Sequence, residues 1–165
     1  MKPALLVIDV QKQFFKGGPV TVQSLTLAME YINPTIALFR EKGLPVICVQ
    51  HMREDEGLLP GTEGFDVPEA LDILPSDLHI HKSYSNAFNK TPLYEILRDL
   101  GVDTVIVTGY CAEYCVLSTC QGAEDLDLTS IIVRGAIASD VPDNIRFVES
   151  INGIISYRVL RKVLA

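Results

Sequence analysis

The chain has 165 residues, of which 48% are hydrophobic and 21% are charged, as expected for one globular domain spanning residues 1–165. Its formal net charge of −7 argues against binding to nucleic acid or to an anionic membrane, because phosphate binding needs clustered Lys and Arg. No signal peptide or apolar run of ~18 residues is visible, so we expect a cytoplasmic protein.

Six short apolar segments are expected to be strands. Most are apolar on both faces, as in a buried parallel strand, whereas the third alternates and the last has the poorest pattern. In chain order the segments are residues 4–9, 45–50, 78–82, 103–109, 129–134 and 153–158.

Four segments between these strands have helical spacing: residues 22–42, 91–101, 114–126 and 144–152. In the first, Pro34 predicts a kink or a break, and Gly43 follows as a stop signal. In the second, Thr91 is expected as the N-cap, with Pro92 at the first helical position and Gly101 as the C-cap. The residues VPD at 141–143 are expected to form a turn.

Alternating strands and helices predict an α/β fold. We expect a single-domain, three-layer α/β/α structure with a mostly parallel, about six-stranded, Rossmann-like sheet. In such sheets ligands bind beyond the carboxyl ends of the strands. Asp9 ends the first predicted strand, Gln50 and His51 end the second, and Lys82 ends the third. Residues 109–115 follow the fourth, so all of these positions can meet at one edge.

Cys115 follows a predicted strand where a loop turns into a helix, a place that lowers the pKa of a thiol. Lys82 is the candidate charge partner and Asp9 the candidate proton acceptor, which together describe an activated nucleophile. A buried cysteine is also a common core residue, so each of these positions has an ordinary structural alternative. The spacing of Cys111, Cys115 and Cys120 does not match a zinc site.

Three blocks of sequence resemble the isochorismatase-like cysteine hydrolases (nicotinamidase/isochorismatase-type amidohydrolases). They are LLVIDVQKQFF at 5–15, KSYSNAFNKTPLYEILRDLGVDTVIVTG at 82–109 and GYCAEYCV at 109–116. The resemblance spans residues 4 to 140 and implies a catalytic triad of Asp9, Lys82 and Cys115. It also implies a cis peptide bond between Tyr110 and Cys111 and an oxyanion hole made by the backbone N–H groups of Cys111 and Cys115.

Some family members hold a metal ion near the triad with an Asp-x-His sequence after the second strand. Here Val49 stands at the position of that Asp, and His51 is the one candidate ligand that remains. The acidic residues between 54 and 63 are more typical of a solvated loop. We therefore expect no cofactor and no metal. Gly135 stands where relatives have Asp, which we expect to affect local structure or assembly.

The expected activity is hydrolysis of a small-molecule amide through a Cys115 acyl-enzyme. Polar and aromatic candidates for the pocket wall, each of which has a core alternative, are Gln11, Phe15, Tyr84, Phe88, Tyr110 and Tyr114. Isochorismate-type hydrolysis of a non-amide substrate is one alternative activity, and a non-catalytic binding or redox-sensing role is another. The resemblance further implies a homo-oligomer, with a small-molecule substrate as the partner.

Overall fold

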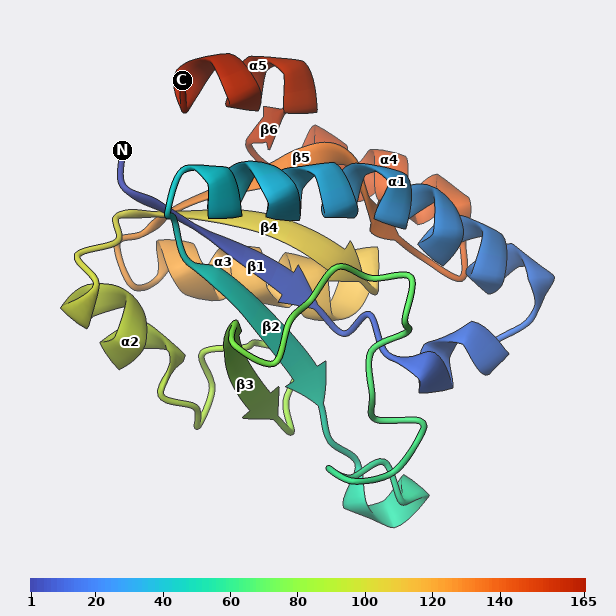
Figure 1. The fold of residues 1–165 in the computed structure, drawn as a ribbon. Helices are drawn as coiled ribbons and strands as arrows, with labels where there is room; N and C mark the ends of the chain where they lie inside the picture. Colours follow the sequence, from blue (N-terminus) through green and yellow to red (C-terminus); the bar gives the residue numbers. More distant parts are fainter.

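A computed structural model describes all of residues 1–165 and contains one sheet of six parallel strands (Figure 1). The strand order is β3-β2-β1-β4-β5-β6, which confirms the predicted α/β architecture. The strands are β1 (Pro3–Ile8), β2 (Val46–His51), β3 (Leu78–Lys82), β4 (Thr104–Tyr110), β5 (Thr129–Ala138) and β6 (Ile154–Ile155).

Helices cover both faces of this sheet, giving the three expected layers. One face is covered by α1 (Pro19–Glu41) and α5 (Tyr157–Val163), and the other by α2 (Leu93–Asp99), α3 (Leu117–Glu124) and α4 (Pro142–Ser150). Short turns are η1 (Lys12–Lys16), η2 (Glu54–Glu56) and the π-helical η3 (Ala112–Val116). No helix has the length and apolar character that crossing a membrane requires.

The central strand β1 contributes to both halves of the core, because successive side chains point to opposite faces. Leu5 and Val7 pack with the apolar face of α1, whereas Leu6 and Ile8 pack with α2, α3 and α4. All six residues of β1 are buried, so the strand is anchored from both sides. The residue that follows it is therefore held in a fixed place.

The helix α1 continues through Pro34, where the sequence predicted a kink or a break. A proline inside a helix costs about 3 kcal/mol. Ile32, Ile36 and Phe39 are all fully buried against the sheet on either side of this position. Their burial, at about 1.5–3 kcal/mol each, outweighs the lost hydrogen bond. Gly43, with a φ of 64°, follows the end of the helix as predicted.

Other differences lie at element ends. The predicted 141–143 turn is wrong, because α4 begins at Pro142, a residue suited to the first turn of a helix. The expected N-cap of α2 is wrong by one residue, because the helix begins at Leu93 with Pro92 as its N-cap, one position after Thr91.

At the C-terminal end, β6 has only two residues, and the unpredicted helix α5 follows it. Strand β5 is longer than predicted, since it passes Gly135, whose φ is 83°, and ends at Ala138. A change of register between β4 and β5 accompanies this extension. A Cβ at Gly135 would lie 2.9 Å from the ring of Tyr31, so the glycine also makes room for α1.

The order in which strands are added to the sheet reverses beside β1. The chain places β2 and then β3 on one side of β1, and then returns to place β4 on the other side. Such a switch point leaves a crevice at the carboxyl ends of the two strands. Asp9 follows β1 and Cys111 follows β4, so both lie at the crevice.

Gly109 is required where β4 runs closest to β1. It has a φ of 116°, and a Cβ there would lie 2.1 Å from the carbonyl oxygen of Ile8. Overpacking and an unfavourable φ each cost about 1–3 kcal/mol, so Gly109→Ala should lower the free energy of unfolding by about 3–5 kcal/mol in urea denaturation. Gly18, with a φ of 105° and no atom within 4 Å, is the matched control. Gly18→Ala should show only the smaller backbone cost, and equal losses in the two variants would contradict a steric role for Gly109.

Candidate active site

Asp9 lies directly beyond β1 and is 1% exposed. Its backbone N–H donates to the carbonyl of Val49 in β2 at 2.8 Å, so the sheet hydrogen bonding continues to this residue. Its φ of 53° is in the left-handed region, which aspartate tolerates better than most residues. The chain turns sharply here, and the carboxylate is left at the switch point.

Lys82, the last residue of β3, brings a buried ammonium to Asp9. Its Nζ donates to Asp9 Oδ2 at 2.9 Å, to His51 Nδ1 at 2.8 Å, to the Tyr84 carbonyl at 3.0 Å and to Cys115 Sγ at 3.3 Å. An ammonium has three N–H groups, so these four acceptors compete for it. The thiol has the longest contact. The structure thus brings the three residues of the expected triad together around one nitrogen.

The Asp9 carboxyl group keeps one oxygen free of hydrogen bonds. Oδ1 is buried and has no partner, whereas Oδ2 binds Lys82. Burial raises the pKa of Asp9 above its ordinary value, and the neighbouring Lys82 ammonium partly opposes this shift. A carboxylate with a raised pKa and an open oxygen is suited to accept a proton.

Cys115 lies in the turn η3, and its Sγ lies within 4.8 Å of a carboxylate oxygen of Asp9. Burial and the Asp9 charge together raise the pKa of this thiol to about 12, although Lys82 partly opposes both. The expectation of a depressed thiol pKa is therefore wrong. Desolvation and the adjacent carboxylate outweigh the start of the helix, so the resting group is a thiol.

Cys111 lies beside the nucleophile candidate but makes different contacts. The peptide bond between Tyr110 and Cys111 is cis, as the resemblance implied. The Cys111 thiol donates to Glu113 at 3.1 Å, and burial together with Glu113 raises the pKa of that thiol to about 12. All four cysteines are free thiols, and Cys120 is a fully buried core residue.

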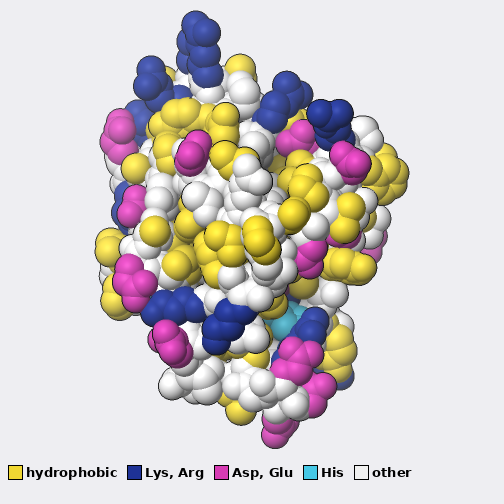
Figure 2. Space-filling model, turned by 90° about the vertical axis from the view of Figure 1, so that its right-hand side faces the viewer, with side chains coloured by type: hydrophobic (Ala, Val, Ile, Leu, Met, Phe, Trp, Pro, Cys, Tyr) yellow, Lys and Arg dark blue, Asp and Glu magenta, His cyan; other side chains and the backbone are white.

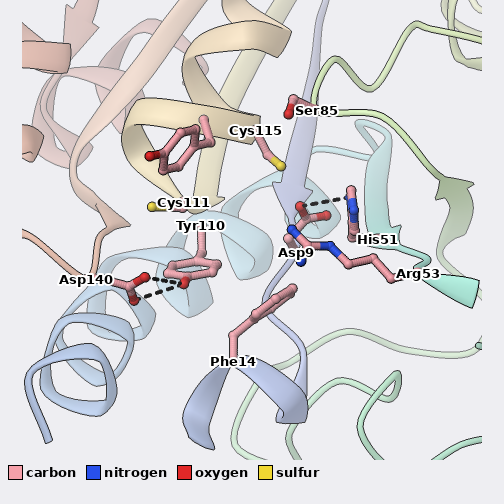
Figure 3. Close-up of a pocket in the computed structure, with 10 residues that line it drawn as sticks. Asp9, Phe14, His51, Arg53, Ser85, Tyr110, Cys111, Cys115 and Asp140 are labelled. Carbon is pink, nitrogen blue, oxygen red and sulfur yellow. Dashed lines mark hydrogen bonds and ion pairs between the residues drawn. The ribbon is translucent and has the colours of Figure 1, made fainter. Parts of the chain in front are cut away.

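A cavity of about 360 Å³ opens beside Asp9 and Cys115, on the side of the molecule where the strands end (Figure 3). On that side, Figure 2 shows one histidine in a hollow, next to a basic side chain and above a group of acidic ones. The cavity is lined by Asp9, Phe14, His51, Arg53, Ser85, Tyr110, Cys111, Tyr114, Cys115 and Asp140.

Two of the six predicted wall residues, Tyr110 and Tyr114, line this cavity. Gln11 is instead fully buried, and its side chain exchanges two hydrogen bonds with the backbone of His51, joining the ends of β1 and β2. Phe15 and Phe88 pack against opposite halves of the core.

Tyr84 does not line the cavity; its carbonyl accepts from Lys82 and its hydroxyl accepts from Lys90. Tyr84 therefore contacts the site through its backbone carbonyl, which accepts a hydrogen bond from the Lys82 ammonium.

Sequence reasoning missed four lining residues: Phe14, Arg53, Ser85 and Asp140. Asp140 lies just beyond the observed end of β5. Asp9 and Lys82 were selected because they stand at the carboxyl ends of predicted strands, and Asp140 was missed because β5 was predicted to end too early. Asp140 accepts hydrogen bonds from Tyr110 at 2.9 and 3.0 Å and from Thr21 at 2.7 Å.

Arg53 lies two residues beyond β2 and pairs with Glu56 at 2.7 Å. The two side chains are 49% and 51% exposed, and an exposed pair of this kind contributes about 0–1 kcal/mol. The signal for Arg53 in the sequence was its position two residues after His51, at the same edge of the sheet.

His51 lines the cavity as a neutral imidazole. Burial, together with the charges of Lys82 and Arg53, lowers its pKa to about 4. Its Nδ1 accepts from Lys82, so the ring proton of the neutral form is on Nε2. His51, Asp9 and Cys115 form the one cluster with metal-ligand atoms close together, and each of those three residues contacts the Lys82 ammonium.

Asp9→Asn separates the effect of Asp9 on the thiol from any role in turnover. The substitution removes a charge that raises the pKa of Cys115 and leaves Lys82 in place, so more thiolate should form at pH 7. One pKa unit corresponds to about a tenfold increase in thiolate, and we expect at least that increase in the rate of iodoacetamide alkylation of Cys115. Peptide mapping would measure the rate. Cys111 is the internal control, and slower or unchanged labelling of Cys115 would contradict the electrostatic account.

Comparison with known proteins identifies the family of this chain. A model of the isochorismatase domain matches residues 3–147. The uncharacterized isochorismatase family protein YrdC of Bacillus subtilis is 32% identical over 84% of this chain and 74% of its own length. Maleamate amidohydrolase of Pseudomonas putida is 26% identical over 82% and 72%. The crystal structure of N-carbamoylsarcosine amidase from Thermoplasma acidophilum superposes with a TM-score of 0.80 at 28% identity, over 94% of this chain and 95% of that one. The chain therefore belongs to the isochorismatase family, a family of hydrolases that includes amidases.

Proposed function

We propose that this chain hydrolyses a C–N bond of a small amide through a covalent Cys115 acyl-enzyme. Asp9 is the general acid and base in this proposal, and Lys82 is the charge partner. The observation that carries it is the set of contacts of Lys82 Nζ, at 2.9 Å from Asp9 and 3.3 Å from Cys115, beside a cavity. The two amide-hydrolysing relatives support the reaction class.

Acylation begins when the thiol proton moves to Asp9. Oδ1 is the open oxygen of that carboxylate, and its raised pKa favours the transfer. The thiolate attacks the amide carbonyl carbon, and the carbonyl oxygen becomes an oxyanion. The backbone N–H groups of Cys111 and Cys115 are the proposed donors to it, and that of Cys111 makes no hydrogen bond within the protein. Losing one such donor typically costs about 10²–10³ in rate.

Collapse of the tetrahedral intermediate breaks the C–N bond. Asp9 gives its proton to the departing nitrogen, which leaves as ammonia or an amine, and a thioester remains on Cys115. Water then enters, Asp9 takes its proton, and the hydroxide attacks the thioester. The carboxylic acid leaves, and the proton on Asp9 returns to the sulfur. Lys82 remains an ammonium throughout and stabilises whichever of the two groups is negative.

Cys115→Ala tests the nucleophile. With a panel of short primary amides and an assay for released ammonia, we expect kcat to fall by at least about 10⁴, since the covalent route is lost. Hydroxylamine added to the wild type should divert the thioester to a hydroxamate. Cys120→Ala, which removes a fully buried thiol in the neighbouring helix, is the control and should retain turnover per folded molecule. Turnover by Cys115→Ala at the wild-type rate would end this mechanism.

We propose that the reaction needs no metal. The candidate ligand atoms of Asp9, His51 and Cys115 surround the Lys82 ammonium, which already supplies the positive charge at their centre. A divalent ion there would lie against that ammonium. The donor set therefore does not fit a cation while Lys82 is charged.

Chelation checks this proposal. Prolonged dialysis against EDTA or 1,10-phenanthroline should leave ammonia release within about twofold of the untreated enzyme. A metal-dependent site would instead lose several kcal/mol of charge stabilisation, and its activity would fall by far more than twofold. Metal analysis of the dialysed protein shows whether any ion remains. Loss of activity on chelation, followed by rescue with zinc or iron, would contradict it.

A further inference from the structure

The two ends of the cavity carry opposite charges. Figure 3 shows Arg53 on the same side as His51, and Asp140 with Tyr110 on the other. Cys115 lies between them, at the wall next to Asp9. A substrate that places its amide carbon at the sulfur therefore extends toward a cationic or an anionic end.

We propose that the substrate amide carries a carboxylate, and that Arg53 binds this carboxylate and so determines specificity. This inference rests on the proposed function and names its substrate class. The monoamide of a short dicarboxylic acid carries both groups, an amide for Cys115 and a carboxylate for Arg53, and these two residues line the same cavity. A guanidinium binds a carboxylate with two parallel hydrogen bonds, which also fixes the direction in which the substrate lies.

The backbone of Arg53 is held while its head group is available. Its N–H donates to the carbonyl of Leu58 and its carbonyl accepts from the N–H of Leu58, both at 2.9 Å. Leu58 is 3% exposed, which anchors this pair in the loop. The guanidinium makes one side-chain contact, from Nη1 to Glu56 at 2.7 Å, and both partners of that pair are half exposed. A ligand carboxylate can therefore replace or share this contact at small cost.

No other cation competes for a carboxylate on the cavity wall. His51 is held neutral by its surroundings, and Lys82 is fully buried with four acceptors around its nitrogen. Asp140 at the opposite end accepts hydrogen bonds from two hydroxyl groups and pairs with no cation, so this acidic side chain disfavours an anion at that end. Attraction at one end and repulsion at the other favour a single orientation of an anionic substrate.

The experiment compares succinamate with butyramide, which have the same chain length and differ by the carboxylate. The quantity measured is the ratio of their kcat/KM values, from ammonia release at low ionic strength. We expect wild type to prefer succinamate, and Arg53→Gln to reduce the ratio by about 10- to 100-fold, the range for a charge-assisted hydrogen bond. Arg53→Lys should recover part of it, because the charge remains but the paired geometry does not.

Glu56→Gln is the second variant, and it separates recognition from mere structural support. Removing the competing carboxylate should raise the ratio several-fold, which a structural role for Arg53 does not predict. Arg98→Gln is the matched control, because Arg98 is an exposed arginine beside Asp99 on α2 and lies outside the cavity. It should leave the ratio unchanged.

Binding of the same two amides to Cys115→Ala, measured by calorimetry, distinguishes failure of this inference from failure of the proposed reaction. Succinamate binding that depends on Arg53, without ammonia release by wild type, would support anion recognition and overturn amide hydrolysis. A wild-type ratio at or below one, or an Arg53→Gln ratio equal to that of wild type, would overturn the role of Arg53. Binding of succinamate no tighter than that of butyramide would overturn it as well.

Discussion

The buried ion pair between Asp9 and Lys82 is the interaction on which the rest of the site depends. The two side chains are 2% and 0% exposed, and removing one partner of such a pair typically costs about 3–5 kcal/mol. Their strands are not neighbours, because β2 lies between β1 and β3. At about 4.8 Å between strands, the lysine stem has to reach across β2, and His51 at the end of β2 accepts a hydrogen bond from its ammonium on the way. Three strands thus converge on one nitrogen.

In the proposed mechanism, this pair also explains how a thiol with a raised pKa acts as the nucleophile. A cysteine activated by a depressed pKa is ionised before the substrate arrives. Cys115 is instead held as a thiol next to a carboxylate whose own pKa is raised, so the proton has a short path to a nearby acceptor. The Lys82 ammonium stabilises the negative charge on either side of the transfer. In the proposed mechanism, activation therefore depends on the relative positions of these three groups.

The proposed reaction centre and the charged residues at the two ends of the cavity come from the same edge of the sheet but from different kinds of structure. Asp9 and Lys82 are fixed by strand ends packed in the core. Arg53 and Asp140 stand on the segments that follow β2 and β5, with exposed side chains. A rigid centre with variable loop residues around it lets one fold retain its chemistry while the substrate changes. The opposite charges of Arg53 and Asp140 give this chain a polarised cavity.

The sequence by itself determined the strand and helix alternation, the sheet class and the identity of the three central residues. These follow from local patterns: apolar runs buried on both faces, polar residues at their ends, and motifs in the right order. Only the tertiary structure decided which candidates face the cavity. Gln11 was predicted to line the pocket, but its amide joins the ends of two strands instead. Asp140 was not predicted because β5 continues past Gly135.

The pKa of Cys115 was also beyond the sequence. Position at the start of a helix predicts a lowered pKa, whereas burial and an Asp9 carboxylate 106 positions away in the chain raise it. Local patterns predict secondary structure and buried faces, because apolar residues recur along the chain with the period of a helix or a strand. Desolvation and the distances between charges are set by residues far apart in sequence, so they exist only once the chain has folded.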